Sequence, residues 1–114
     1  MIIAIDFDGT IVEHKYPEIG EEIPNAFKVL NVLKEEGHTL ILWTFRSGKL
    51  LAKAVHYCKQ NGLEFYAINS NSPEEAYVPQ LSRKIYADLY IDDRNILGIP
   101  DWGTMYNMIS PDNQ

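Results

Sequence analysis

Hydrophobic and polar positions follow two kinds of pattern along the chain. Residues 2–7 form a short continuous apolar run that leads into Asp-Gly-Thr, which is typical of a buried strand followed by a loop. From Pro24 to Glu36 apolar residues recur at the spacing of one helix face, with proline suited to the first turn and Gly37 placed as a stop. The chain is therefore predicted to begin with a strand and a helix.

The same alternation continues further along the chain. Residues 38–44 (HTLILWT) are apolar and rich in strand-forming residues, and Ser47 is placed to cap a helix that Gly62 ends. The face of that helix is predicted to carry Leu51, Ala54, Val55 and Cys58. Two further strands are predicted over residues 64–69 and 85–91, separated by a polar loop that includes residues 69–79.

Strands that alternate with helices indicate a parallel sheet with right-handed crossovers and helices on both faces. We therefore predict an α/β fold, a Rossmann-like three-layer domain. The 114 residues are close to the usual size of one domain, so residues 1–114 are expected to form a single domain. Ligands bind such sheets at the carboxyl ends of the strands, and candidate chemistry is expected there.

Composition restricts the partners that we expect. The formal net charge of −6 and the pI of about 4.9 argue against a broad nucleic-acid surface, which would need clustered Lys and Arg. No apolar run approaches the roughly 20 residues that span a bilayer, and no basic segment precedes the first apolar run, so neither a membrane partner nor secretion is expected. The single Cys58 cannot form an internal disulfide, which favours a cytoplasmic location.

Acidic residues follow two of the predicted strands. Asp6 and Asp8 come after the first strand, and Asp92 and Asp93 come after the fourth, so their side chains should converge at one edge of the sheet. Two carboxylates ~4 Å apart repel by about 4 kcal/mol at an effective dielectric of about 20. Oxygen ligands without paired His or Cys favour a hard cation, and we predict Mg²⁺.

Possible partners for phosphate oxygens lie near these acids in the sequence pattern. Thr44 closes the second strand, Arg46 follows it, and Lys84 precedes the fourth strand; all three are predicted to bind the substrate. One carboxylate can attack phosphorus while a second donates and later accepts a proton. Asp6 and Asp8 fit these two roles.

The order of these residues resembles the phosphatases of the haloacid dehalogenase (HAD) superfamily. The first motif of that family, Asp-x-Asp-Gly-Thr, matches residues 6–10 in full. The later motifs, a Thr or Ser after strand two, a Lys, and an acidic pair after an apolar strand, match Thr44, Lys84 and the pair Asp92-Asp93. The resemblance covers about residues 2–95.

The resemblance implies a role for each matched residue. Asp6 would be the nucleophile and a metal ligand, and Asp8 would be the general acid and base and offer its backbone carbonyl to Mg²⁺. Thr44 and Lys84 would hold the phosphoryl group as catalytic residues. Asp92 would be the third metal ligand, and Asp93 would share the metal through water or orient the lysine. The implied activity is hydrolysis of a phosphate monoester through an aspartyl phosphate.

Other interpretations of the same residues stay open. Asp-Gly-Thr is also a common turn, and residues 92–95 could form only a polar loop. Either Lys84 or the adjacent Arg83 could be a solvated surface charge, and Arg46 could be a surface residue. At the level of function, the alternatives are a receiver-like phospho-acceptor domain of signalling systems and a catalytically silent HAD-like binding domain. A receiver domain would place the acidic pair after strand one and the acceptor aspartate after strand three, and this chain has a different order.

Room for a cap domain is small in this chain. HAD-family caps enter between the first and second motifs or before the lysine, and here only residues 12–22 remain in the first gap, as a flap over the site. The second gap, residues 69–84, is too short to fold independently. We therefore expect a capless enzyme acting on a small phosphorylated substrate. A large partner or the second subunit of a homo-oligomer would cover the site, or selectivity would be low.

Overall fold

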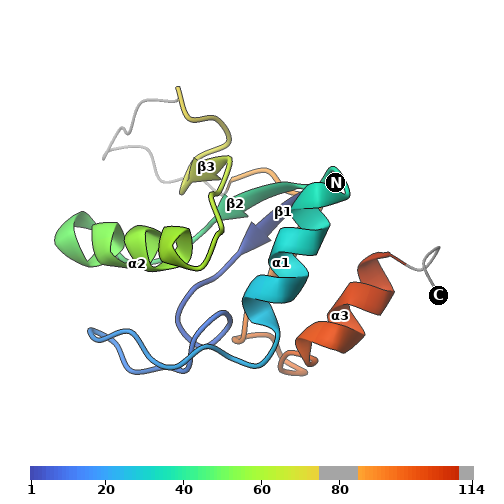
Figure 1. Cartoon of the computed structure of the whole chain (residues 1–114), viewed down its shortest axis with the longest axis horizontal. Helices are drawn as coiled ribbons and strands as arrows, with labels where there is room; N and C mark the ends of the chain where they lie inside the picture. The colour runs from blue at the N-terminus through green and yellow to red at the C-terminus, as the bar shows by residue number, and fades with distance from the viewer. Residues whose placement is uncertain (75–84, 111–114) are drawn as a thin grey trace.

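The computed structural model describes residues 1–74 and 85–110 of the chain. In these residues, strands and helices alternate through most of the chain (Figure 1): β1 (Ile2–Ile5), α1 (Ala26–Glu35), β2 (Thr39–Leu42), α2 (Gly48–Gln60), β3 (Ala67–Ile68), β4 (Leu89–Ile91) and α3 (Trp102–Ile109). The sheet has the order β3-β2-β1-β4, and each neighbouring pair is parallel. The predicted α/β fold with a parallel sheet is confirmed.

The strand register brings the ends of three strands to one edge. Ile5, the last residue of β1, lies opposite Leu42 in β2 and Ile91 in β4. In a parallel sheet the loops that follow neighbouring strands leave from the same edge. The loop after β1 and the loop after β4 therefore start side by side, which is the placement that the candidate chemistry requires.

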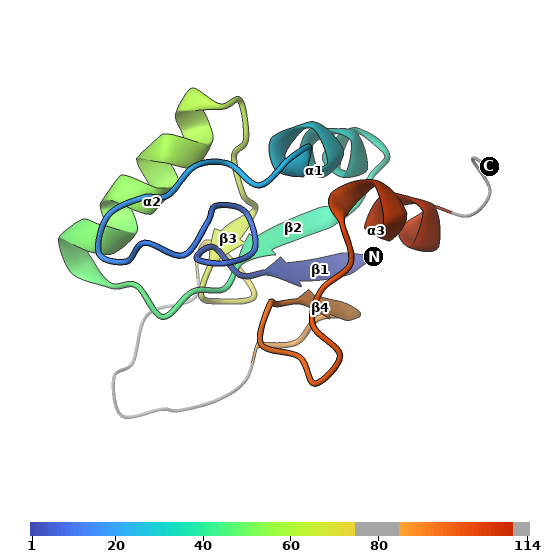
Figure 2. The same ribbon diagram turned by 90° about the horizontal axis from the view of Figure 1, so that it is seen from below.

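Alternation along the strands divides the core into two faces. Ile3 and Ile5 of β1 pack in one apolar cluster that also holds residues from all three helices, while Ala4 and Ile41 belong to a second cluster. Figures 1 and 2 show α1 and α3 side by side, and buried Trp102 lies in the same cluster as the α1 side chains. The helices described here thus cover one face of the sheet.

The second face of the sheet is covered differently. Its cluster holds Ile85 and Ala87, from the segment before β4, against sheet residues such as Ala67. Our three-layer prediction needs a helix on this face as well. Residues 75–84, which precede this segment, lie outside the described part of the chain, so the third layer stays a prediction.

The helix boundaries agree with the sequence signals, with local differences. Gly37 and Gly62 follow α1 and α2 with positive φ of 96° and 80°, the conformation in which glycine ends a helix. Ser47 is the N-cap residue of α2, but its side chain makes no capping hydrogen bond. Helix α1 begins at Ala26 rather than Pro24, because its N-cap Asn25 is left-handed with φ of 69°.

Strands β3 and β4 are shorter than their predicted ranges, and α3 was not predicted. The N-cap of α3 is Asp101, whose carboxylate accepts a hydrogen bond from the Thr104 N–H at 2.8 Å. Trp102 and Met105 are its buried residues, at a helical spacing that the sequence displays. The Asp-x-x-Thr signal and this spacing would have been enough to find it.

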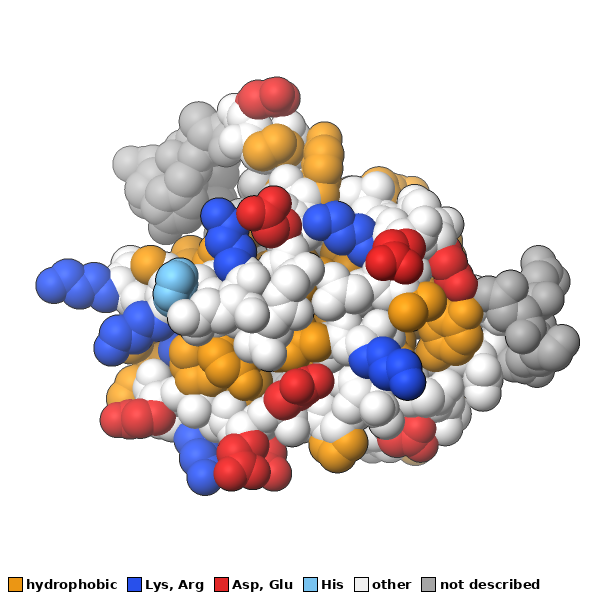
Figure 3. All heavy atoms as spheres, viewed as in Figure 1, with side chains coloured by type: hydrophobic (Ala, Val, Ile, Leu, Met, Phe, Trp, Pro, Cys, Tyr) orange, Lys and Arg blue, Asp and Glu red, His pale blue; other side chains and the backbone are white. Residues whose placement is uncertain are grey.

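The surface seen in Figure 3 mixes acidic and basic side chains, with apolar ones between them. Neither sign of charge gathers into a single patch on this face, so the net charge of −6 does not appear there as one acidic field. Within the described residues, no helix is both long and apolar enough to cross a membrane.

Candidate functional site

Three carboxylates meet at the carboxyl edge of the sheet. Asp6 directly follows β1, and Asp92 and Asp93 directly follow β4. One ligand atom from each lies within 4.8 Å of the others, and all three side chains are half-buried. The structure therefore brings together three of the four residues predicted as metal ligands.

The electrostatics of this cluster are unfavourable for three negative charges. Burial, together with the neighbouring Asp92 and Asp93 carboxylates, raises the pKa of Asp6 to about 7, and the hydrogen bond from the Phe7 backbone N–H acts in the opposite direction. Burial and like charge both disfavour the ionised form of an acid. A positive charge at this cluster, from a proton on Asp6 or from a cation, would relieve the repulsion.

A threonine ties the two loops of the cluster together. The Thr10 hydroxyl donates to Asp6 Oδ2 at 3.3 Å and accepts from the Asp93 backbone N–H at 3.1 Å. The indole Nε1 of Trp102 donates to the Thr10 carbonyl at 3.1 Å, which attaches α3 to the same loop. Thr10 belongs to the Asp-x-Asp-Gly-Thr motif, and its position at the end of that motif is the signal that could have assigned this role.

Asp93 carries an oxygen that lacks a hydrogen-bond partner. Its Oδ1 is buried, and no hydrogen bond to it is found among the described residues. Its Oδ2 lies so close to Gly9 that a Cβ on that residue would stand 2.2 Å away, and Gly9 has φ of +85°. Glycine is therefore required at position 9, and the unpartnered carboxylate oxygen next to it has the chemistry of a cation ligand.

Asp92 is held by its own turn. Its Oδ1 accepts from the Arg94 N–H at 2.8 Å, and its carbonyl accepts from the Asn95 side-chain amide at 2.5 Å. This turn aims the Asp92 carboxylate at the cluster, and the polar-loop alternative thus describes its backbone correctly. The sequence left open whether Asp92 or Asp93 is the predicted direct metal ligand, and the geometry places both in the cluster.

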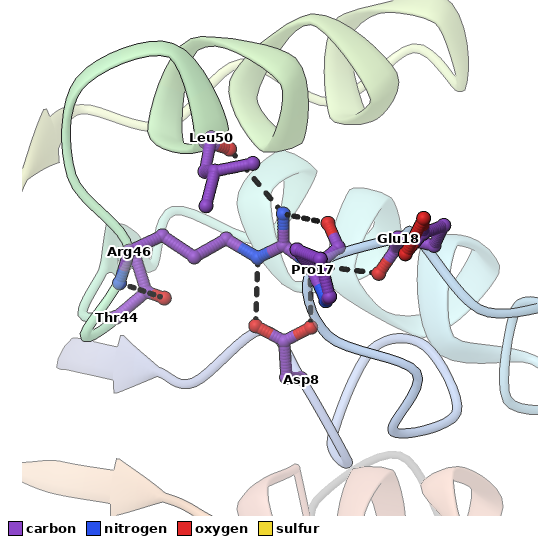
Figure 4. Close-up of polar contacts among 6 residues, drawn as sticks. All are labelled: Asp8, Pro17, Glu18, Thr44, Arg46 and Leu50. Carbon is purple, nitrogen blue, oxygen red and sulfur yellow. Dashed lines mark hydrogen bonds and ion pairs between the residues drawn. The ribbon is translucent and has the colours of Figure 1, made fainter.

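Asp8 has a different partner. Both of its carboxylate oxygens accept hydrogen bonds from Arg46, one from Nε and one from Nη2, each at 2.8 Å (Figure 4). Both side chains have 0% exposure. This is a buried, bidentate ion pair, in which the carboxylate accepts two strong hydrogen bonds and donates none.

Every donor of the Arg46 guanidinium is used. Its remaining N–H groups donate to the carbonyls of Pro17, Glu18 and Leu50 at 3.3, 2.9 and 3.4 Å. With the two bonds to Asp8, each of the five N–H groups has an acceptor. The bond to Asp8 raises the pKa of Arg46 above its ordinary value.

Neither sequence interpretation of Arg46 describes this arrangement. The residue is 1% exposed, so the alternative of a surface arginine is wrong. It was also predicted to bind the substrate, but its guanidinium has no unpaired N–H to offer a phosphate in this conformation. No local pattern indicates this arrangement, because the acceptors come from three separate segments of the chain.

Thr44 lies two residues after the end of β2, next to this pair. Its hydroxyl accepts from the Arg46 backbone N–H at 3.2 Å, and its own N–H donates to the Asn69 side-chain oxygen at 2.8 Å. Asn69 follows β3 with a left-handed φ of 54°, and its sequence position gave no signal of a site role. The predicted catalytic Lys84 lies outside the described residues, so its role stays a prediction.

Two of the grooves that the described residues form lie beside the sheet. One of about 450 Å³ lies along α2 and β3 and contains none of the three clustered carboxylates. The other, of about 460 Å³, is lined mainly by apolar residues of β4, the following loop and α3, and it includes Asp92. Only this second groove adjoins the acidic cluster, so it offers space beside the candidate site.

Comparison with known proteins gives one informative relative. No protein-family model matches the chain, and no curated protein matches it either. A solved structure, described as that of the conserved protein coded by locus from Bacteroides thetaiotaomicron, has 57% sequence identity and a TM-score of 0.91. The match covers 100% of this chain and 93% of that one. The chain therefore belongs to the same family as this conserved protein of Bacteroides thetaiotaomicron.

Proposed function

We propose that this chain is a magnesium-dependent phosphatase of the HAD type that hydrolyses a phosphate monoester through an aspartyl phosphate on Asp6. The supporting observation is the cluster of three carboxylates within 4.8 Å at the carboxyl edge of the sheet. The cluster includes an unpartnered, buried oxygen of Asp93 and adjoins the Asp-x-Asp-Gly-Thr motif.

The donor set of this site fits magnesium. Asp6, Asp92 and Asp93 offer carboxylate oxygens, and the resemblance adds the backbone carbonyl of Asp8. Mg²⁺ prefers oxygen ligands and commonly takes only a few from the protein. When bound, the ion would supply the positive charge that the carboxylates and the substrate oxygens share.

The protein's own residues would carry the reaction in two steps. In the first, an Asp6 oxygen forms a bond to phosphorus while the ester bond breaks, and the departing oxygen takes a proton from Asp8. In the second, Asp8 takes a proton from water, the water oxygen bonds to phosphorus, and the Asp6 carboxylate leaves. Thr44 and Lys84 would bind the phosphoryl oxygens during both steps.

Among the alternatives, the receiver-like domain is disfavoured by the order of the acidic residues. A receiver domain would have an acceptor aspartate after β3, where this chain has Asn69. The Asn69 side chain instead accepts a hydrogen bond from Thr44. The acidic pair follows β4, the last strand of the described sheet. A silent binding domain would keep the same geometry, and turnover distinguishes it from an enzyme.

We propose a small phosphate ester as the substrate and a capless site. Between β1 and α1 the chain forms only loop and two isolated bridges, Asp8–Val12 and Val12–Glu22, and no separate unit. The groove of about 460 Å³ beside Asp92 gives room for a leaving group. A second subunit is one way to cover the site. The buried single thiol of Cys58 fits a reducing compartment, and we propose the cytoplasm.

The test is a screen of the purified protein against a panel of phosphate esters, with Mg²⁺ and with excess chelator. Asp6→Asn should lower turnover by at least about 10³-fold, since it removes the nucleophile and keeps the shape. Asp101→Asn, which changes a carboxylate at the start of α3, is the matched control and should stay active. Substantial activity of Asp6→Asn, full activity in chelator, or dependence on zinc would each contradict the proposal.

A further inference from the structure

Arg46 links three segments that are separate in the sequence. Its guanidinium bonds Asp8 in the loop after β1, the carbonyls of Pro17 and Glu18, and the carbonyl of Leu50 in the first turn of α2 (Figure 4). Pro17 and Glu18 belong to the flap, which we define as residues 12–22. One buried side chain thus holds the flap and the proposed acid and base at the same time.

Aromatic rings add a second attachment of the flap to Arg46. The guanidinium carbon lies 5.2 Å from the ring centroid of Phe7 and 5.1 Å from that of Tyr16. Tyr16 is a flap residue, and its ring centroid is 4.8 Å from that of Phe45, which follows Thr44. A cation within about 6 Å of an aromatic ring is attracted to its face. The flap is therefore attached to Arg46 through both backbone and side chain.

The base of the flap is closed by its own backbone. The Glu13 N–H donates to the Glu21 carbonyl at 2.8 Å, and the Ile23 N–H donates to the Ile11 carbonyl at 2.9 Å. Gly20 packs so tightly that a Cβ there would lie 2.1 Å from the Glu13 carbonyl oxygen. The base can stay closed while the tip of the flap, residues 14–19, moves. Arg46 bonds this tip at the carbonyls of Pro17 and Glu18.

We propose that Arg46 is a positioning residue that couples the flap to Asp8. A guanidinium is planar and its donors point in fixed directions, so it cannot turn toward one partner without losing another. If the flap carbonyls move away, buried N–H groups lose their acceptors; if Asp8 turns away, a buried cation loses its counter-charge. Neither partner is free to move alone.

The coupling also bears on catalysis, and this part of the inference rests on the proposed reaction. Both Asp8 oxygens accept from Arg46, so Asp8 can give a proton to a leaving group only after one of these bonds opens. Because the same guanidinium holds the flap, the position of the flap determines when that bond opens. Arg46 would then act through Asp8, without touching the substrate.

Limited trypsin digestion tests the coupling without any need for activity. Lys15 is exposed on the flap tip, and cleavage after it requires the tip to leave the surface. When opening is fast relative to cleavage, the cleavage rate reports the open population. The rate is measured by mass spectrometry and compared with cleavage at Lys34 in α1, which reports opening of the core helix.

Four proteins form a double-mutant cycle: wild type, Asp8→Asn, Arg46→Lys and the double variant. We expect each single variant to be cleaved after Lys15 about tenfold faster than wild type, or more. The double variant should be cleaved little faster than the faster single variant, because either substitution alone already removes the coupling between the flap and Asp8. Cleavage at Lys34 should change much less, and Asp101→Asn should match wild type.

Two results of this cycle would overturn the coupling. One is an Asp8→Asn protein that is cleaved after Lys15 at the wild-type rate, because Arg46 would then hold the flap without help from Asp8. The other is a double variant whose acceleration is the product of the two single ones, because independent sites behave in that way. Asn is nearly isosteric with Asp, so Asp8→Asn should fold normally. Its cleavage rate therefore tests the coupling even if Arg46→Lys folds poorly.

Kinetics separate this inference from the proposed function. On an ester that the wild type hydrolyses, Arg46→Lys should lower kcat with KM within about twofold, and Arg46→Met should lose more kcat than Arg46→Lys. A roughly tenfold rise in KM with kcat unchanged would make Arg46 a substrate ligand and overturn the inference. An inactive wild type with a coupled digestion cycle would refute the phosphatase alone.

Discussion

Replacement of the proposed nucleophile, Asp6→Asn, should stabilise the metal-free protein at neutral pH while it abolishes turnover. Asp6 is half-buried and faces Asp92 and Asp93, and these surroundings raise its pKa from 3.8 to about 7. An amide cannot ionise, and it can still accept the hydrogen bond that Thr10 donates to Asp6. The substitution therefore removes the repulsion with little change of shape.

The direction of this stability change follows from the protonation of Asp6 in the folded and in the unfolded chain. Between pH 3.8 and about 7 the unfolded chain loses the Asp6 proton while the folded chain keeps it. Rising pH then favours unfolding, so the stability that this carboxyl contributes is complete below pH 3.8 and is lost as the pH rises through about 7. Asp6→Asn should not show this loss of stability, because its amide does not titrate.

The pKa shift of Asp6 from 3.8 to about 7 determines how large the stabilisation can be. At about 1.4 kcal/mol for each pKa unit, the upper limit is ~4 kcal/mol. The partial exposure of Asp6 reduces this figure through solvent screening, and we expect the variant to be about 1–3 kcal/mol more stable than wild type at about pH 8.

The assay is urea denaturation in excess chelator at a series of pH values, followed by tryptophan fluorescence. Wild type should lose stability from about pH 4 to about pH 7, and the curve of Asp6→Asn should be flatter. Added Mg²⁺ should raise the stability of wild type more than that of the variant, because binding to the native state stabilises it. A variant that is less stable than wild type at about pH 8 in chelator would refute the reasoning.

Further predictions concern the surroundings of the site. Gly9→Ala should cost at least about 1–2 kcal/mol of unfolding free energy and weaken the stabilisation by Mg²⁺, both measured by denaturation, since the residue has φ of +85° and its Cβ would lie 2.2 Å from Asp93 Oδ2. Trp102→Phe should cost about 1 kcal/mol because it leaves the Thr10 carbonyl without its donor, and an unchanged denaturation midpoint would contradict this. Burial raises the pKa of the Cys58 thiol to about 12, so thiol reagents should label it slowly until denaturant is added, and rapid native labelling would contradict its buried position.

The sequence was sufficient where local periodicity and position along a strand decide the outcome. Apolar spacing predicted β1, α1, β2 and α2 close to their observed places, because burial of one helix face or a whole strand leaves a pattern that tertiary contacts do not change. The convergence of Asp6, Asp92 and Asp93 was predicted in the same way, from the rule that parallel strands end at one edge.

The tertiary structure decided how far each strand extends. Residues 64–69 were predicted as a strand, but β3 covers only Ala67–Ile68, and it pairs with β2 alone on the edge of the sheet. The propensity of a short apolar run does not fix its length, because strand length depends on the neighbour that accepts its hydrogen bonds. The same reason explains the short β4, which pairs with β1.

The tertiary structure alone decided which polar groups are partners. Arg46 and Asp8 lie 38 residues apart in the sequence, and Thr10 and Asp93 lie 83 apart, yet both pairs bond directly. A residue type states what a side chain can bind, and the chain's packing determines which acceptors lie within reach of it. The sequence therefore determined the fold class and the acids at the sheet edge, while packing turned Arg46 into a buried link between the flap and Asp8.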